Sequence, residues 1–180
     1  MKRFTLAGNQ QQNLTVQQQA VVDSNEPTVL VNAVAGSGKT ATLMHLATKY
    51  KKGIYLAFNK AIVKDVVPKL PMGWTCDRFK IAHKFIDESK EILAIGKANT
   101  NVISGDDMLQ YPIDNGWKSE EYEIVLIDEC QDLNPQQIAF LTCLPTKRIV
   151  FVGDMNQAIY GFRGSDPYAM DKIRENYNPV

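Results

Sequence analysis

The sequence has few cysteines and no excess of charge of either sign. Its 180 residues include three cysteines, Cys76, Cys130 and Cys143, which lie far apart and show no CxxC spacing. A disulfide framework and a zinc site are therefore not expected, and a reducing cytoplasm is the favoured compartment. Lysine plus arginine and aspartate plus glutamate number 20 each. Because no global positive charge indicates a nucleic-acid partner, any such binding must depend on a local surface.

Long apolar segments are also lacking. No apolar run reaches the roughly 18 residues of a membrane helix, and the first residues, MKRFTLAGNQ, lack the apolar centre of a signal peptide. We therefore expect a soluble, cytoplasmic protein with no membrane partner. Since 44% of the residues are hydrophobic and 9% are aromatic, the chain can build one ordinary globular core with at most a small appendage.

Four apolar runs have the character of strands buried on both faces. They span residues 28–34, 53–58, 123–129 and 148–154. Helical patterns lie between them, and the glutamine-rich residues 9–23 form a polar arm that leads into a helix. Strands that alternate with helices indicate an α/β fold, in which helices cover both faces of a parallel sheet. Between residues 87 and 118 the pattern weakens, which predicts a small inserted subdomain.

The segment AVAGSGKT, residues 33–40, follows the first strand and precedes a helix. In that context Gly36 and Gly38 allow backbone N–H groups to curl around phosphate oxygens. Lys39 reaches the terminal phosphates, and the Thr40 hydroxyl is a magnesium ligand. An alanine stands at the first position of the pattern G-x-x-x-x-G-K-[ST], and a glycine-rich turn without a chemical role is the alternative. The nucleotide-binding residues expected here are Ala35, Gly36, Ser37, Gly38, Lys39 and Thr40.

The segment IVLIDECQD supplies the acidic half of such a site. Asp128 stands where its strand leaves the sheet, a position suited to binding magnesium, and Glu129 can orient or deprotonate an attacking water. The alternative is that the two acids merely end a strand. Together with the P-loop, they predict nucleoside triphosphate hydrolysis.

Three segments carry a resemblance to a known family. VAGSGKT, IDECQDLNPQQ and VGDMNQAIYGFRGSDP resemble motifs I, II and III of the UvrD/Rep/PcrA-like superfamily 1 DNA helicases. QAIYGFRG separates the chain from the RecD-like branch, whose equivalent segment usually continues into Leu-Pro. The resemblance runs from about Leu14 to the C-terminus and covers the first of two RecA-like motor lobes. In this family Gln131 links the hydrolytic site to motif III.

The resemblance implies a division of the chain and a set of partners. It implies a polar arm at 1–13, a RecA-like P-loop lobe at 14–86 and 119–180, and a short insertion at 87–118 that resembles a reduced 1B subdomain. A reduced 1B subdomain would make fewer contacts with duplex DNA. The implied cofactors are ATP and magnesium, and the implied partners are single-stranded DNA and a second RecA-like lobe.

Two further segments resemble the Q motif and motif Ia of the family. LTVQQQAVV places Gln18 near the adenine edge, where an amide can donate and accept at once. A glutamine on the helix surface is the alternative, because the neighbours Gln17 and Gln19 blur the register. YLAFNKAIVKDV places Phe58 and Asn59 against single-stranded DNA, and Phe58 is equally compatible with a core position.

Within motif III the resemblance implies that one loop contacts both ATP and DNA. Asp154 is expected beside the magnesium ion and Gln157 near the terminal phosphate. Tyr160 and Phe162 are expected against DNA bases, where stacking serves a motor that ignores sequence. Arg163 would couple the two sites through a phosphate or an acid of motif II. The alternative is that the aromatic residues belong to the core and that the arginine forms a solvated ion pair.

The chain also departs from the family pattern. In the segment CDRFKIAHKF, residues 76–85, Asp77 puts an acid where a neutral hydroxyl usually faces DNA. IRENYNP, residues 173–179, resembles the start of motif IV, with Asn178 in the place of an arginine that reaches ATP.

Two hypotheses remain open. The first is the ATP-binding lobe of a UvrD-like helicase, present as a fragment that is weak or inactive alone, whose parent translocates 3′ to 5′ on single-stranded DNA by family resemblance. Its expected catalytic residues are Lys39, Asp128, Glu129, Gln157 and Arg163. The second is a free-standing, non-motor module that binds DNA or protein in an ATP-dependent way. A small-molecule P-loop kinase is disfavoured, because QAIYGFRG has no role in a kinase.

Overall fold

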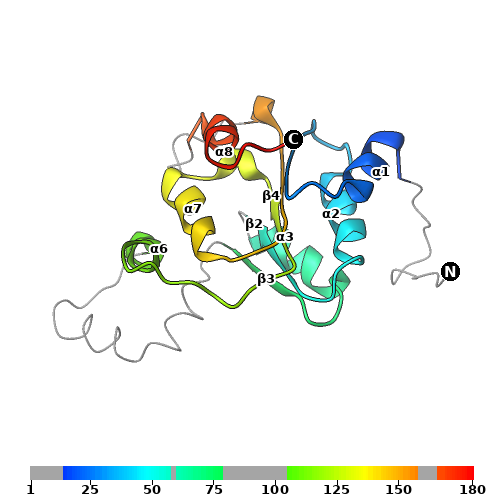
Figure 1. Ribbon diagram of the computed structural model, residues 1–180. Coiled ribbons are helices and arrows are strands. Elements are labelled where there is room, and N and C mark those ends of the chain that lie inside the picture. The colour runs from blue at the N-terminus through cyan, green and yellow to red at the C-terminus, as the bar shows by residue number, and fades with distance from the viewer. Residues whose placement is uncertain (1–13, 58–59, 79–104, 158–165) are drawn as a thin grey trace.

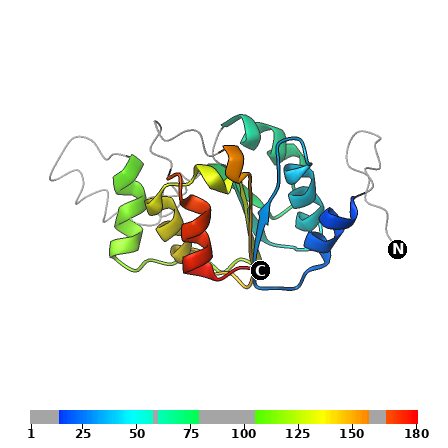
Figure 2. The same cartoon turned by 90° about the horizontal axis from the view of Figure 1, so that it is seen from above.

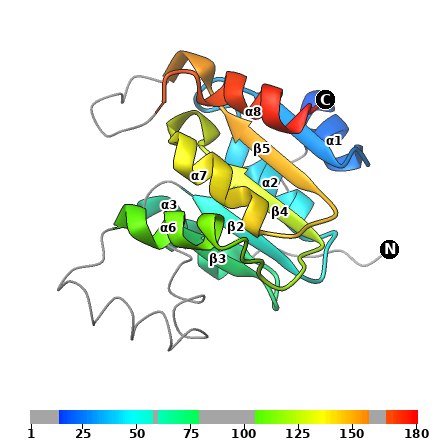
Figure 3. The same ribbon diagram turned by 60° about the vertical axis from the view of Figure 1, so that its left-hand side comes forward.

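The core of the molecule is a five-stranded sheet in the order β1-β5-β4-β2-β3. A computed structural model describes residues 14–57, 60–78, 105–157 and 166–180. The strands are β1 (Thr28–Asn32), β2 (Gly53–Ala57), β3 (Thr75–Arg78), β4 (Ile124–Asp128) and β5 (Ile149–Gly153). All four neighbouring pairs are parallel, so the carboxyl ends of the strands meet at one edge of the sheet (Figure 3).

Helices cover both faces of the sheet (Figures 1 and 2). On one face lie α1 (Val16–Asp23), α2 (Lys39–Ala47) and α3 (Lys60–Val66). On the other face lie α6 (Gly105–Asp114), α7 (Pro135–Phe140) and α8 (Ala169–Tyr177). Short 3-10 helices are η1 (Val67–Lys69), η2 (Cys130–Asp132), η3 (Leu141–Cys143) and η4 (Met155–Gln157). The predicted α/β class is confirmed. No described helix is long and apolar enough to cross a membrane.

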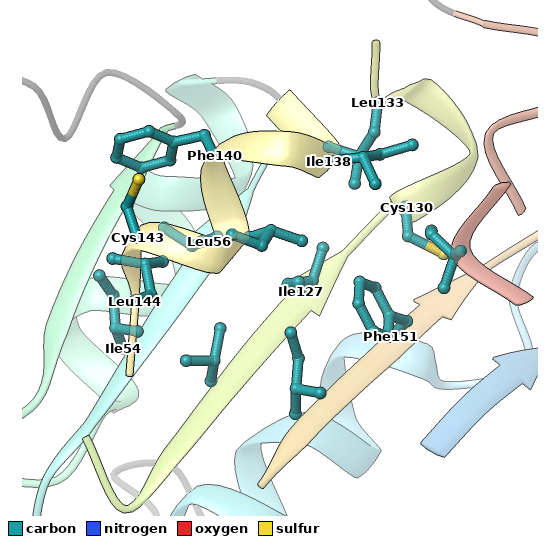
Figure 4. Close-up of a cluster of buried hydrophobic side chains, with 14 of the residues drawn as sticks. Ile54, Leu56, Ile127, Cys130, Leu133, Ile138, Phe140, Cys143, Leu144 and Phe151 are labelled. Atoms are coloured by element: carbon teal, nitrogen blue, oxygen red, sulfur yellow. The ribbon is translucent and has the colours of Figure 1, made fainter. Parts of the chain in front are cut away.

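Each inner strand supplies two hydrophobic cores, because successive side chains point to opposite faces of the sheet. The side chains that face α6, α7 and α8 include Ile54, Leu56, Val125, Ile127, Ile149 and Phe151. Figure 4 shows this cluster, in which Phe140 and Ile138 of α7 lie over the strands. The side chains that face α1, α2 and α3 include Val29, Tyr55, Ala57, Ile124, Leu126, Val150 and Val152. Asp128 shares the face of Leu126, two residues before it, so it points toward the P-loop helix α2.

The observed elements differ from the predicted ones in three places. Three of the four predicted strands are two residues too long. Ala33, Glu129 and Asp154 already belong to the loops at the carboxyl edge. The strand β3 was not predicted, and it pairs in parallel with β2. The helix α6 lies within the predicted insertion, and its Leu109 is buried in the cluster shared with α7. The proposed division into subdomains stays a prediction.

The C-terminal residues lie along the edge of β1. Asn178 ends α8 in the left-handed conformation, with φ 43°. The Val180 N–H donates to the Thr28 carbonyl at 3.1 Å, and the Val180 carbonyl accepts from the Leu30 N–H at 3.0 Å. Thr28 begins β1 and the P-loop follows its other end, so Asn178 lies far from the P-loop. The interpretation of Asn178 as standing in the place of an ATP-contacting arginine stays a prediction.

Candidate nucleotide and magnesium site

Three adjacent strands bring the predicted motifs to one edge of the sheet. The P-loop follows β1, the acids of motif II end and follow β4, and Asp154 follows β5, which lies between them. In open parallel sheets, ligands bind outside the carboxyl ends of the strands. The topology thus assembles a single candidate site from segments that are distant in the sequence.

The P-loop has the backbone conformation that phosphate binding requires. Gly36 and Gly38 have φ angles of 74° and 83°, which glycine adopts without steric cost. Gly38 is the N-cap of α2, and no side chain caps the helix, so its first N–H groups are oriented for an anion. The Lys39 ammonium donates to the Ala33 carbonyl at 3.3 Å. Because Ala33 contributes only its backbone here, the departure from glycine leaves this contact intact.

The carboxylate of Asp128 is the most enclosed acid of the site, with no exposed surface. Its Oδ2 accepts hydrogen bonds from the Thr40 hydroxyl at 2.8 Å and from the Tyr55 hydroxyl at 2.5 Å. Its Oδ1 accepts from the Glu129 N–H at 3.0 Å. A hydroxyl and a carboxylate are the hard oxygen donors that magnesium prefers, usually together with substrate phosphates. Thr40 and Asp128 therefore fit a magnesium ion, which would neutralise phosphate charge when bound.

Glu129 stands at the point where the chain leaves β4. Its φ of 53° is left-handed, a conformation that is uncommon for residues other than glycine and that concentrates at functional sites. The turn brings its carboxylate to 3.7 Å from the Lys39 ammonium. An acid beside the phosphate-binding lysine is placed to orient or deprotonate a water.

Gln131 joins motif II to motif III. Its amide nitrogen donates to the Glu129 carboxylate at 2.8 Å, and its amide oxygen accepts from the Asp154 N–H at 3.0 Å. Gly153 makes this approach possible, since a Cβ there would lie 2.6 Å from the same amide oxygen. These contacts are those expected of the linking glutamine in the helicase family, and the functional coupling itself stays a prediction.

The described part of motif III is fixed to the P-loop strand. The Met155 N–H donates to the Asn32 side-chain oxygen at 3.1 Å, and the Asn156 N–H donates to Asp154 Oδ1 at 3.0 Å. Gln157 ends η4 and donates its N–H to the Asp154 carbonyl. Asn32 was not singled out from the sequence. The other predicted DNA and coupling residues, Phe58, Asn59, Tyr160, Phe162 and Arg163, lie outside the described residues.

Gln18 contacts the P-loop backbone. Its amide oxygen accepts from the Thr15 N–H at 2.8 Å in a capping box, and its amide nitrogen donates to the Ser37 carbonyl at 2.9 Å. A pocket between α1 and the P-loop is lined by Gln18, Val21 and Lys39, among others. The glutamine is thus more than a residue of the helix surface, and its contact with adenine stays a prediction.

Tyr55 is a second site residue that sequence analysis missed. Burial, followed by the charge of Asp128, raises the pKa of Tyr55 well above its ordinary value, so its hydroxyl remains a donor at neutral pH. The same two causes raise the pKa of Cys130. The signal in the sequence was weak: Tyr55 is a polar-tipped aromatic in the middle of the otherwise apolar strand GIYLA.

Comparison with known proteins finds DNA helicases among the relatives of this chain. The chain is 42% identical over 60 residues to the mitochondrial ATP-dependent DNA helicase HMI1 of Saccharomyces cerevisiae, covering 33% of this chain and 8% of the relative. It is 32% identical over 102 residues to the RecB subunit of the RecBCD enzyme of Escherichia coli, covering 48% and 9%. It is 35% identical over 80 residues to a probable DNA helicase II homolog of Mycoplasma genitalium, covering 43% and 11%.

The matched segments span about a tenth of the length of these curated relatives. The family model described as the UvrD/REP helicase N-terminal domain matches residues 84–178, which is more than half of the chain. The chain therefore belongs to the UvrD/REP helicase N-terminal domain family.

Proposed function

We propose that this chain is the ATP-binding lobe of a DNA helicase, which couples ATP hydrolysis to 3′-to-5′ translocation on single-stranded DNA. One observation carries the proposal. The Thr40 hydroxyl donates to Asp128 at 2.8 Å while the Lys39 ammonium lies 3.7 Å from Glu129. The phosphate-binding residues and the acids thus lie within contact distance of each other, as magnesium-dependent phosphoryl transfer requires.

Each residue of the site has a defined task in this proposal. Lys39 and the P-loop N–H groups bind the phosphates, and Thr40 and Asp128 hold magnesium. Glu129 orients a water for attack and accepts its proton. Lys39 now lies against Glu129, and binding of the terminal phosphate would draw the lysine toward the phosphate charge.

Gln131 gives this site a route to motif III. Because its amide contacts both the Glu129 carboxylate and the Asp154 N–H, a change at Glu129 alters a hydrogen bond that holds the start of motif III. Tyr160, Phe162 and Arg163 follow in the sequence, and we propose that they carry the change to single-stranded DNA. Phe58 and Asn59 are proposed to bind the same strand. A second RecA-like lobe completes the motor in this proposal.

The test compares nucleotide binding and hydrolysis by the unsubstituted chain and by Lys39→Ala, each with and without single-stranded oligonucleotide. Loss of the buried lysine should weaken binding of a fluorescent ATP analogue at least ~30-fold, equivalent to roughly 2 kcal/mol. Lys51→Ala is the matched control, because Lys51 is an exposed lysine, and it should bind normally. We expect the oligonucleotide to change the affinity for nucleotide or the rate of hydrolysis.

Two results would count against the proposal. Equal binding of nucleotide by Lys39→Ala would show that the P-loop is not the nucleotide site. Nucleotide binding that is lost in Lys39→Ala yet insensitive to single-stranded DNA would instead favour a non-motor module that binds protein in an ATP-dependent way.

A further inference from the structure

Tyr55 lies in the middle of the sheet with its hydroxyl directed at the site. It belongs to β2, between β3 and β4, and its partner in the register with β4 is Leu126. Asp128 follows Leu126 by two residues, so it lies on the same face and nearer the carboxyl edge. The tyrosine ring has no exposed surface, and its hydroxyl reaches Asp128 Oδ2 at 2.5 Å.

Tyr55 and Thr40 donate to the same carboxylate oxygen. Two donors on Oδ2, together with the Glu129 N–H on Oδ1, fix the rotation of the carboxylate. The Thr40 hydroxyl has a single proton, which it gives to Asp128, and it also lies within hydrogen-bonding reach of the Tyr55 hydroxyl. The arrangement therefore sets the directions of the Thr40 hydroxyl and of the Asp128 carboxylate, the two groups that are expected to bind magnesium.

Packing alone does not explain a tyrosine at this position. Phenylalanine would fill the same apolar space, whereas a buried phenol must find a hydrogen-bond partner. The partner it finds is the buried acid of motif II. Mutation of groups that hydrogen-bond to metal ligands typically costs about 10- to 100-fold in metal affinity or activity.

We propose that Tyr55 is a positioning residue of the magnesium site: its hydroxyl fixes the Asp128 carboxylate in the orientation in which that carboxylate holds the Thr40 hydroxyl. This inference rests on the proposed function and deepens it. According to this inference, a residue of β2, which lies outside the P-loop and the two acids of motif II, contributes to the affinity for magnesium.

The test measures metal binding directly. Manganese replaces magnesium, and the signal of free manganese in electron paramagnetic resonance reports its affinity for the protein–ADP complex. Tyr55→Phe should weaken manganese binding about 10-fold, while the affinity for ADP in excess chelator stays equal to that of the unsubstituted chain. Tyr177→Phe is the matched control, because the Tyr177 hydroxyl donates to the Ile138 carbonyl on the opposite face of the sheet. It should bind manganese normally.

The outcomes separate this inference from the proposed function. If the unsubstituted chain binds no nucleotide in the presence of metal, the proposed function and the inference both fail. If it binds nucleotide and metal, but the manganese titrations of Tyr55→Phe and the unsubstituted chain coincide, the inference alone is overturned. Equal weakening in Tyr177→Phe would also overturn it.

A second variant guards against misfolding. Should the space left by the lost oxygen prevent Tyr55→Phe from folding, Tyr55→4-fluorophenylalanine fills that space with an atom that cannot donate a hydrogen bond. It should show the same loss of manganese affinity, and unchanged affinity would overturn the inference.

Discussion

The two edges of the sheet both contain buried charged side chains, but the partners of these side chains differ between the two edges. At the carboxyl edge, Lys39 lies near Glu129 and the Asp128 carboxylate meets the Thr40 hydroxyl. At the amino edge, the residue before β5 is Arg148, which is also buried. Its guanidinium donates to the Tyr50 hydroxyl at 2.8 Å and to the Val21 carbonyl at 3.4 Å.

This difference separates a candidate binding site from a structural anchor. Val21 belongs to the last turn of α1, where carbonyls lack partners within the helix and attract cations. Lys49 donates to the next carbonyl, that of Val22, at 2.5 Å. The cations of the amino edge therefore cap the C-terminal end of α1. The charges of the carboxyl edge lie at the end of β4 and at the start of α2, on the side of the sheet where open parallel sheets bind ligands.

The largest expected contrast comes from removing one cation at each edge. Lys39→Met should weaken nucleotide binding at least ~30-fold, with little change in the free energy of unfolding. Arg148→Met should lower that free energy by about 1–3 kcal/mol, because it leaves buried hydrogen-bonding groups without partners. Nucleotide titrations and urea denaturation of both variants measure the contrast. If Arg148→Met, while folded, bound nucleotide as weakly as Lys39→Met, the two edges would not differ as we describe.

A pair of glycines sharpens the same comparison with a smaller effect. A Cβ on Gly153 would lie 2.6 Å from the Gln131 amide oxygen, and a Cβ on Gly53, at the amino end of β2, would lie 2.6 Å from the Trp74 ring. Alanine at either position should cost about 1–3 kcal/mol of stability through overpacking. Only Gly153→Ala should also impair hydrolysis, since it separates Gln131 from Asp154. Equal hydrolysis by the two folded variants would disprove the role of that contact.

The smallest effect concerns an acid that stabilises the fold. The hydrogen bond from Lys172, opposed in part by burial and aided by the Tyr168 N–H, lowers the pKa of Asp166. A lowered pKa contributes stability above the ordinary value near ~3.9 that is lost as the pH falls through the folded-state value. Unfolding measured between pH 6 and 3 should show this loss, up to about 1 kcal/mol. Asp166→Asn should make the profile flatter, and an unchanged profile would exclude this contribution.

Much of the site could be predicted because it consists of characteristic residue types within short segments of the sequence. Gly36 and Gly38 are required by a left-handed backbone, and Asp128 and Glu129 end an apolar run, so the sequence signals are direct. The strand ends were missed by a residue or two, since a run of apolar residues does not show where strand pairing ends; Val34, for example, is apolar and yet exposed beyond β1. The parallel α/β fold followed from strands alternating with helices.

Other features depend on contacts that a sequence does not display. The strand β3 exists because it pairs with β2, and the role of Tyr55 depends on its register against Leu126. The position of Asn178 depends on such a contact as well. It is the pairing of Val180 with the amino end of β1 that places Asn178, and no local pattern indicates that pairing.

The most direct test of the account asks which edge of the sheet binds metal and nucleotide. Manganese–ADP added to isotope-labelled protein broadens the amide resonances of residues near the bound ion. We predict that broadening is strongest at Gly38, Lys39, Thr40 and Glu129 at the carboxyl edge and clearly weaker at Thr28 and Ile149 at the amino edge. Broadening centred on the amino edge, or none at saturating nucleotide, would contradict the account.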